Sequence, residues 1–267
     1  MKNYLRLSSL VGVLLVAVAC VGTTGGELVT FTAAAAGPAD VSGHRLTFTS
    51  GRGFQVVLTR AILHVGALYL NESLPVSGAQ STDCVLPGTY VAQETTGRDI
   101  DLLDATPQVF PDYGDATSTL ARAGEVWLKG DGSVNDPADS TPILTIEGTA
   151  TEGAESWVFF GELTIGASRL RAVTDASLPS AHPICKERIV SPIALPPITP
   201  TQGGTLMLRI DPRELFVNVD FSSLKQASTM PTRYRFADAS TDQASASLYQ
   251  ALRASGNLYQ FSWEQQK

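Results

Sequence analysis

One polar turn carries the densest group of oxygen-donor side chains in the sequence. Its donors are the carboxylate, hydroxyl and amide groups of Asp131, Ser133, Asn135, Asp136 and Asp139. Calcium binds six to eight oxygen ligands, which often come from Asp and Asn in loops. The spacing 131-133-135 resembles the opening of a calcium loop, but Asp136 occupies the usual glycine position and Pro142 that of a bidentate glutamate. If the chain binds an ion, we expect calcium at this turn; otherwise the turn is a solvated hairpin loop.

A second group of acids lies in the segment from Arg98 to Asp104. On a strand, Asp99 and Asp101 share one face and Ile100 takes the other. Two carboxylates at a suitable separation can perform the acid–base steps of glycoside hydrolysis. A solvated strand face explains the same pattern. The sequence also lacks the local motifs of nucleophile-elbow hydrolases, phosphate-binding loops and zinc peptidases, so no residue is predicted to be catalytic.

Nitrogen and sulfur donors are few and scattered. The histidines are His44, His64 and His182, and no two of them stand at a ligand-like spacing. Together with Met207 and Met230 they could suit Cu(I), which prefers soft ligands. Ordinary packing in strands explains His64 and Met207 equally, so copper is a less favoured ion than calcium.

The N-terminus has the pattern of an export signal. Lys2 and Arg6 precede an uncharged apolar or small stretch at residues 7–19. As a helix this stretch rises about 20 Å, which is too short for a bilayer core of about 30 Å. A basic start, a short apolar segment and a small-residue exit are typical of a secretory signal peptide.

The exit reads Ala17-Val18-Ala19-Cys20 and resembles the lipobox of bacterial lipoproteins. In that family a dedicated peptidase cleaves before a cysteine that becomes lipid-modified. The resemblance implies a signal peptide at 1–19, a lipidated Cys20 with a tether at 20–26, and membrane anchoring through acyl chains. Val21 follows Cys20 where an Asp often signals inner-membrane retention, which favours the outer membrane. The alternative is an ordinary signal peptide in which Cys20 is incidental.

If Cys20 is lipidated, Cys84 and Cys185 remain as a pair. An exported chain enters an oxidising compartment, so an even number of remaining cysteines predicts a disulfide. A thiol metal site with nearby His182 is the alternative, although no CxxC motif is present.

The remaining composition indicates strands joined by turns. Hydrophobic residues make up 43%, enough for a core, and the net charge of -7 argues against a nucleic-acid partner. Short runs rich in β-formers are bounded by Gly and Pro. We expect strands at 28–33, 46–49, 54–70, 89–95, 98–104, 124–129, 143–150, 157–165, 205–210, 215–221 and 258–263. Loops are expected at 71–88 and 105–120, and a Pro-rich crossover at 191–204.

Two of these segments have internal detail. The long segment 54–70 is expected to bend at Gly66, with Leu63, Val65, Ala67 and Tyr69 on one face. One helix is expected near the end, with Ser240 and Gln243 as a capping box and one apolar face. That face consists of Ala244, Leu248 and Leu252.

This pattern predicts a mainly β, two-sheet sandwich, Ig-like in general architecture, with one short C-terminal helix and a single domain at 27–267. The segments 54–70 and 210–221 resemble uncharacterised exported β-rich lipoproteins of Gram-negative bacteria. We therefore expect a membrane-anchored, non-catalytic binding or envelope-structural module with an envelope protein or a glycan as partner. The alternatives are a cell-envelope hydrolase with carboxylates from distant strands, or an ion-binding protein, calcium before copper.

Overall fold

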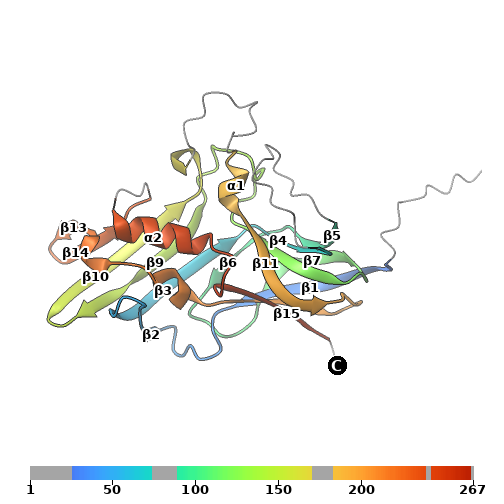
Figure 1. Cartoon of the computed structure of the whole chain (residues 1–267), viewed down its shortest axis with the longest axis horizontal. Helices are drawn as coiled ribbons and strands as arrows, with labels where there is room; N and C mark the ends of the chain where they lie inside the picture. Colours follow the sequence, from blue (N-terminus) through green and yellow to red (C-terminus); the bar gives the residue numbers. More distant parts are fainter. Residues whose placement is uncertain (1–25, 74–88, 170–182, 239–241, 266–267) are drawn as a thin grey trace, which may run out of the picture.

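The computed structural model describes residues 26–73, 89–169, 183–238 and 242–265, which form two β-sheets and a few short helices (Figure 1). The fold class predicted from the sequence is confirmed: the chain is mainly β, has two sheets in a sandwich-like arrangement, and has one helix of some length near its C-terminal end. Among the described residues, no helix has the length and apolar character needed to cross a membrane.

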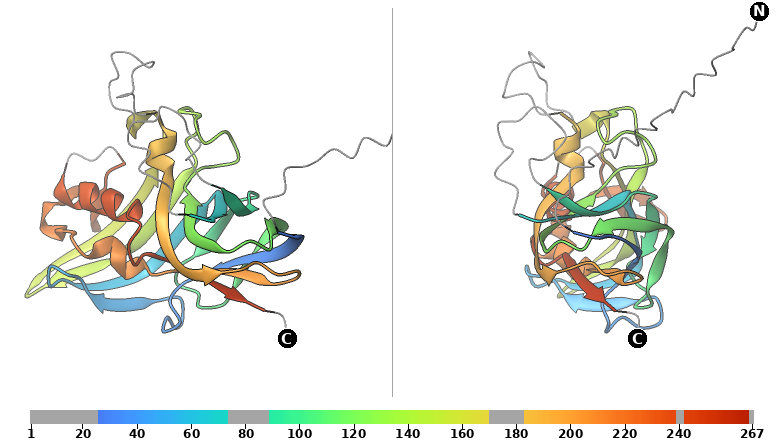
Figure 2. Two further views of the ribbon diagram at one scale, coloured as in Figure 1. Left: turned by 45° about the vertical axis from the view of Figure 1, so that its right-hand side comes forward. Right: turned by 90° about the vertical axis from the view of Figure 1, so that its right-hand side faces the viewer.

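The first sheet has eight strands. In pairing order they are β11 (Ile189–Ile198), β8 (Ala121–Trp127), β4 (Ala67–Asn71), β5 (Tyr90–Glu94), β7 (Gln108–Thr117), β1 (Leu28–Ala36), β12 (Thr205–Ile210) and β15 (Tyr259–Glu264). Only β1 and β12 run parallel to each other. The sheet curls until its end strands β11 and β15 come into contact (Figure 2). Gly124 permits this curl, because a Cβ there would lie 2.4 Å from the ring of Phe261.

The second sheet lies at the other end of the molecule (Figure 1). Its strands in pairing order are β13 (Lys225–Thr229), β14 (Thr232–Phe236), β10 (Glu155–Thr164), β9 (Pro142–Glu152), β3 (Gln55–Val65) and β2 (Leu46–Thr49), and β6 (Arg98–Asp101) also pairs with β3. The predicted hairpin of β9 and β10 is confirmed, with antiparallel pairing around a turn at Gly153. The φ of Gly153 is 58°, which favours glycine.

One long stretch of chain joins the two sheets, because β3 leads directly into β4. The predicted bend at Gly66 is confirmed: β3 ends at Val65 and β4 begins at Ala67. The amide of Gly66 donates to the carbonyl oxygen of Trp127 at 2.8 Å. A Cβ on Gly66 would lie 2.1 Å from the carbonyl oxygen of Lys129, so only glycine fits.

The bend also changes which residues face the core. Leu63 belongs to the buried core before the bend, whereas Leu68 and Leu70 belong to it afterwards. Tyr69 therefore lies on the opposite face of the sheet. The predicted continuous face from Leu63 to Tyr69 is wrong, because it assumed an unbroken alternation through Gly66.

A single buried cluster takes side chains from both sheets and from the C-terminal helix. The helices are η2 (Ala167–Arg169), α1 (Cys185–Arg188), η3 (Pro212–Phe216), η4 (Phe221–Ser223) and α2 (Gln243–Leu252). α2 buries the predicted apolar face of Ala244, Leu248 and Leu252. Its N-cap is Asp242, whose side chain accepts from the amide of Ser245 at 2.7 Å. The predicted cap Ser240 lies outside the described residues.

The strand predicted at 215–221 is wrong, because η3 and η4 occupy this part of the chain. Asp211 accepts from the amide of Arg213 and Asp220 from the amide of Ser222, so a side-chain cap starts each turn of helix. The alternating apolar residues suggested a strand, in which Leu215 and Phe216 would face opposite sides. The short helix η3 instead buries both of them.

The loop predicted at 105–120 is also wrong, because residues 108–117 form β7. Pro111 is exposed within that strand, and Gly114 makes room for the ring of Phe31 on β1. The crossover predicted at 191–204 is wrong for its first half, which belongs to β11. β11 is an end strand, where proline is tolerated because no second partner needs its missing N–H. Its pairing with β8 shifts between Val190 and Ile193, around Pro192.

Candidate functional site

A buried glutamate on the outer face of the first sheet anchors the candidate site. Glu125 on β8 is completely buried. Its Oε1 accepts from Asn71 Nδ2 at 3.0 Å and from Ser191 Oγ at 3.2 Å. Its Oε2 accepts from the indole Nε1 of Trp127 at 3.0 Å and the hydroxyl of Tyr90 at 3.5 Å. Donors from four strands, β4, β5, β8 and β11, thus converge on one carboxylate.

The electrostatics of this glutamate are unusual because no cationic side chain is near it in the described part of the chain. Burial raises the pKa of Glu125, and the hydrogen bonds from its neutral donors oppose that shift without cancelling it. Tyr69 lies directly opposite Glu125 in the β4–β8 ladder. Burial raises the pKa of Tyr69, and the charges of Glu125 and Glu94 raise it further. Groups with this combination of burial and shifted pKa concentrate at functional sites.

Three aromatic rings surround the carboxylate. The ring centroid of Tyr69 lies 4.5 Å from that of Trp127 and 5.1 Å from that of Tyr90, in tilted and edge-to-face geometry. Such pairs hold their rings in a defined orientation. Because Trp127 and Tyr90 also donate to Glu125, both ends of the aromatic cluster are fixed by the same acid. The rings of this cluster are half-buried, so each keeps part of its surface toward solvent.

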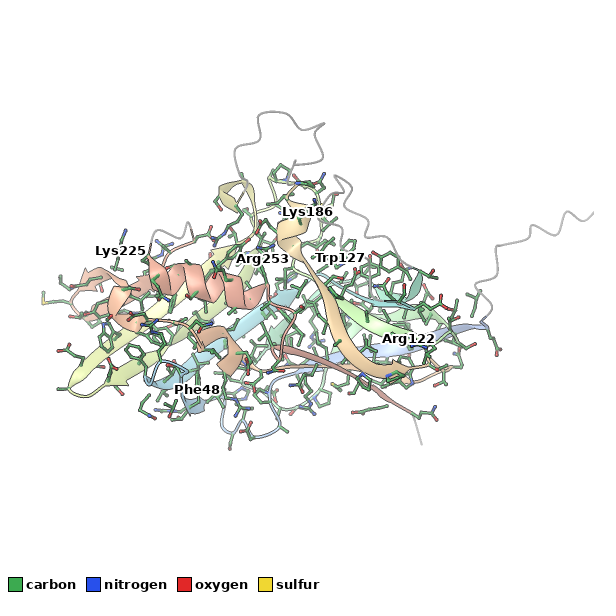
Figure 3. All side chains as sticks on the ribbon, in the orientation of Figure 1. Phe48, Arg122, Trp127, Lys186, Lys225 and Arg253 are labelled. Carbon is green, nitrogen blue, oxygen red and sulfur yellow. The ribbon has the colours of Figure 1, made fainter. Side chains whose placement is uncertain are left out.

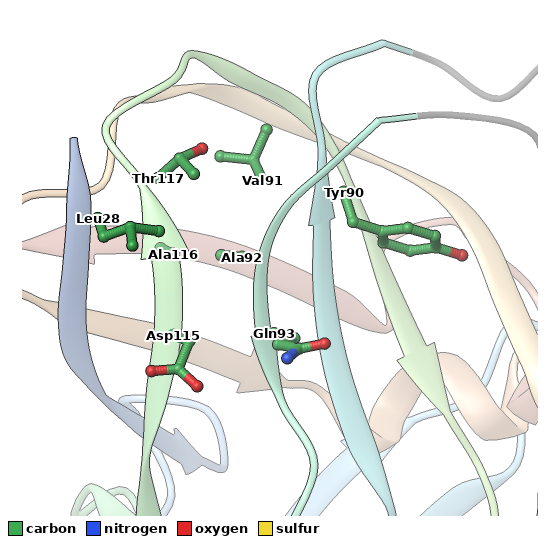
Figure 4. A pocket seen from close by; sticks show the side chains of 8 residues that line it. All are labelled: Leu28, Tyr90, Val91, Ala92, Gln93, Asp115, Ala116 and Thr117. Carbon is green, nitrogen blue, oxygen red and sulfur yellow. The ribbon is translucent and has the colours of Figure 1, made fainter. Parts of the chain in front are cut away.

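A groove adjoins this cluster between β5 and β7 (Figure 4). The two strands pair only at Ala92–Ala116 and Gln93–Asp115, so they leave a depression beside that short ladder. The depression has a volume of about 260 Å³. It is lined by Leu28, Tyr90, Val91, Ala92, Gln93, Asp115, Ala116 and Thr117.

The carboxylate and the amide of the groove lie at one end of it. Gln93 and Asp115 lie side by side there, whereas Val91 and Thr117 lie toward the other end and Leu28 lies level with Ala116 (Figure 4). The ring of Tyr90 points away from the groove, toward the aromatic cluster. Tyr90 therefore connects the groove with Glu125, and we call the cluster and the groove together the aromatic face. Glu125 was missed at the sequence level; the available signal was an acid within the apolar strand segment GEVWLK.

The predicted pairing of Asp99 and Asp101 on one strand face is confirmed, since both alternate with buried Ile100 on β6. Each carboxylate contacts a histidine rather than standing free. Asp101 Oδ2 lies 2.9 Å from Nδ1 of His44, and Asp99 Oδ1 lies 2.7 Å from Nδ1 of His64. The Nε2 atom of His64 is buried and has no hydrogen-bond partner among the residues that the structure describes. The structure thus brings together acids and histidines that the sequence showed as separate groups.

The loop predicted to bind calcium is arranged around an arginine. Arg188 at the end of α1 is completely buried, and its guanidinium donates to the carbonyl oxygens of Ile165, Ser133, Val134 and Asp139 (2.7 to 3.3 Å). Its Nη2 also lies 3.5 Å from the carboxylate of Asp139. Main-chain oxygens and one carboxylate of the loop therefore already contact a cation, the guanidinium of Arg188.

The side chains of the same loop are engaged in local bonds. Asp139 accepts from the amides of Gly130 and Thr141, both at 2.9 Å. Burial acts to raise its pKa, but these hydrogen bonds and the charge of Arg188 together lower it. Asp136 accepts from the amide of Ala138. Within the described ranges no group of three or more His, Cys, Asp or Glu side chains could hold a metal ion. That set does not include hydroxyl, amide or main-chain oxygens, so the calcium site at 131–139 stays a prediction.

The residues considered for copper lie on separate elements. His64 is on β3, Met207 is buried on β12 in the other sheet, and Met230 is 91% exposed in the turn between β13 and β14. Met207 thus packs, as the alternative interpretation held. His182 lies outside the described residues.

Cys185 is the first residue of α1; it is completely buried and disulfide-bonded. Cys84 and Cys20 lie outside the described residues. The pairing of Cys84 with Cys185 and the lipidation of Cys20 therefore stay predictions.

Comparison of the chain with protein-family models, with curated proteins and with solved structures found no significant match.

Proposed function

We propose that the protein is an exported lipoprotein, anchored to the cell envelope through Cys20, that acts as a non-catalytic binding module. Its binding surface is the aromatic cluster together with Gln93 and Asp115 of the adjoining groove, and the ligand class that this surface fits best is a glycan. The observation that carries the proposal is the aromatic cluster of Tyr69, Tyr90 and Trp127, held from below by the buried carboxylate of Glu125.

The physical support for a binding role is preorganisation. Rings that are fixed before the ligand arrives lose little conformational freedom on binding, which preserves affinity. Sugar rings stack on aromatic surfaces, and their hydroxyls bond to carboxylates and amides such as those of Asp115 and Gln93. An aromatic surface beside the amide of Gln93 and the carboxylate of Asp115 combines both interactions. An envelope protein with aromatic or hydroxyl side chains is the other partner that this surface could accept.

The binding test uses the purified full chain and a panel of neutral oligosaccharides, with chito-oligosaccharides as the first probe. Ligand stacking should change the fluorescence of Trp127, and calorimetry gives the dissociation constant. Tyr69→Ala removes the central ring and should weaken binding tenfold or more, which corresponds to about 1.4 kcal/mol. Tyr234→Ala is the matched control, because this tyrosine is also half-buried but lies on β14 of the other sheet.

Equal affinity of the wild type and Tyr69→Ala for a bound glycan would place the ligand elsewhere. Absence of binding across the whole panel would remove the glycan from the proposal. The anchor is tested separately by mass spectrometry of the mature protein. We expect an N-terminal Cys20 carrying acyl chains, and any other unmodified N-terminus would contradict the lipoprotein assignment.

A hydrolase is the second candidate, and the two carboxylate–imidazole pairs favour it. Asp101 holds Nδ1 of His44, whose side chain is 69% exposed, and such a contact orients an imidazole for general acid–base work. The test is hydrolysis of chromogenic esters and glycosides by the purified chain. A rate that His44→Gln abolishes, while His64→Gln leaves it unchanged, would favour the enzyme over the binding module.

A further inference from the structure

Three exposed apolar side chains form a stripe on one face of the β1–β7 ladder. Leu28 is 82% exposed, Tyr113 is 76% exposed and Val109 is 47% exposed. Tyr113 lies opposite Thr32 and Val109 lies opposite Ala34, which are separated from Leu28 by even numbers of residues along β1. Alternate residues on a strand share a face, and directly opposed residues do too. The register shifts between Thr32 and Ala34, where β7 holds two residues more than β1. Both intervals are even, so the three side chains still lie on the same face.

We propose that this stripe of Leu28, Tyr113 and Val109 rests on the surface of a zwitterionic lipid bilayer. The inference builds on the proposed lipid anchor at Cys20. β1 begins at Leu28, eight residues after that cysteine. Eight fully extended residues reach at most about 29 Å. The anchor thus holds one end of the stripe within that distance of the bilayer.

The geometry of the stripe suits a flat surface. From Leu28 to Ala34 is six residues along β1, which corresponds to a length of about 20 Å. Tyrosine is enriched where membranes meet water, because its ring is apolar and its hydroxyl stays hydrated. Tethering keeps the local concentration of lipid high, so a weak contact of three side chains is sufficient to orient the protein.

The charges near the stripe select the kind of lipid. Asp112 and Asp115 are exposed on β7, and Asp115 shares the face of Tyr113. Arg98 donates to the carbonyl oxygen of Val109, but the two carboxylates outnumber this cation. Carboxylates close to an anionic headgroup would repel it. A neutral zwitterionic surface avoids that repulsion, so added anionic lipid should weaken the contact, most clearly at low salt.

The test reconstitutes the full lipidated chain into phosphatidylcholine vesicles that contain brominated acyl chains, which quench tryptophan emission on contact. Tyr113→Trp places a reporter in the stripe. Val158→Trp is the matched control, because Val158 is 42% exposed on β10 of the other sheet, at the opposite end of the molecule (Figure 1). Emission of the wild type, with its native tryptophans, is subtracted from both.

We expect loss of most of the added emission for Tyr113→Trp and no loss for Val158→Trp. Vesicle flotation separates the two proposals. A chain that floats with the vesicles but shows no quenching at residue 113 overturns the membrane contact alone. A chain that does not float overturns the lipid anchor and this inference with it. Self-association through residue 113 without lipid quenching would mean that a second copy covers the stripe, and stronger quenching with anionic lipid would refute the zwitterionic surface.

Discussion

Replacement of Arg188 by methionine tests most sharply what stabilises the loop at residues 131–139. Methionine keeps an unbranched apolar stem but removes every N–H of the guanidinium. The carbonyl oxygens of Ser133 and Val134 lie in a loop with exposed neighbours and can bind water instead. The carbonyl oxygen of Ile165, 2.7 Å from Nε, belongs to a buried residue and loses its donor.

The magnitude follows from those buried partners. The carboxylate of Asp139 is only 10% exposed and would lose its cation. Removal of one member of a buried ion pair typically costs about 3–5 kcal/mol, because the remaining charge stays buried without a partner. For a chain of this size each kcal/mol lowers Tm by roughly 2–4 °C. We expect Arg188→Met to lower the free energy of unfolding by about 3–5 kcal/mol by this reasoning.

The assay is urea unfolding followed by circular dichroism and tryptophan fluorescence, with a calorimetric Tm as a second measurement. Arg52→Met is the matched control, since Arg52 is 48% exposed and its ion pair with Asp220 spans 3.4 Å. An exposed pair of this kind contributes about 0–1 kcal/mol. Equal unfolding free energies for the two variants would refute the reasoning. The calcium site predicted at this loop is tested separately: a rise in wild-type Tm with millimolar calcium over chelator, lost when Asp131→Ala and Asp136→Ala are combined, would support it.

Further predictions concern the pKa of Glu125, the bend at Gly66 and the disulfide bond of Cys185. Burial raises the pKa of Glu125 above its ordinary value of 4.5, so the folded chain binds its proton more tightly than the unfolded chain. The free energy of unfolding should therefore fall as pH rises from that value through the raised pKa, a dependence that Glu125→Gln should remove; identical pH profiles would contradict this. Gly66→Ala should cost about 1–3 kcal/mol in chemical denaturation, because its Cβ meets a backbone oxygen. Gly256→Ala, with open space around it, should be nearly neutral, and equal costs would show that the bend is not the cause. Intact mass after alkylation without reductant should show Cys84 and Cys185 unmodified, whereas two alkylated thiols would exclude the bond.

The sequence by itself determined the elements whose signal is local. The hairpin at 142–164 follows from two β-rich runs around a Gly-containing turn. The bend of the long strand follows from Gly66, and the buried face of α2 from the spacing of its apolar residues. Each of these depends on backbone preferences or on side chains a few residues apart, which is the range over which a pattern in one sequence is informative.

Local pattern failed where a neighbour from elsewhere in the chain decided the conformation. Residues 108–117 look like a loop because of Pro111 and Gly114, yet the glycine makes room for the ring of Phe31 and the segment pairs as β7. Proline did not prevent β11, because the strand lies at the end of its sheet. The alternation at 215–221 suggested a strand, but capping by Asp211 and Asp220 produced two short helices instead.

The candidate site was decided almost wholly by tertiary structure. Glu125, Tyr69 and Tyr90 lie far apart in the sequence, and only the pairing of β4 with both β5 and β8 makes them neighbours. Arg188 likewise reaches a loop some fifty residues earlier. The carboxylate of Asp139 contacts Arg188, and that of Glu125 contacts aromatic residues. Contacts of this kind have no fixed spacing in the sequence. The residue types were visible in the sequence, but their partners were set by the fold.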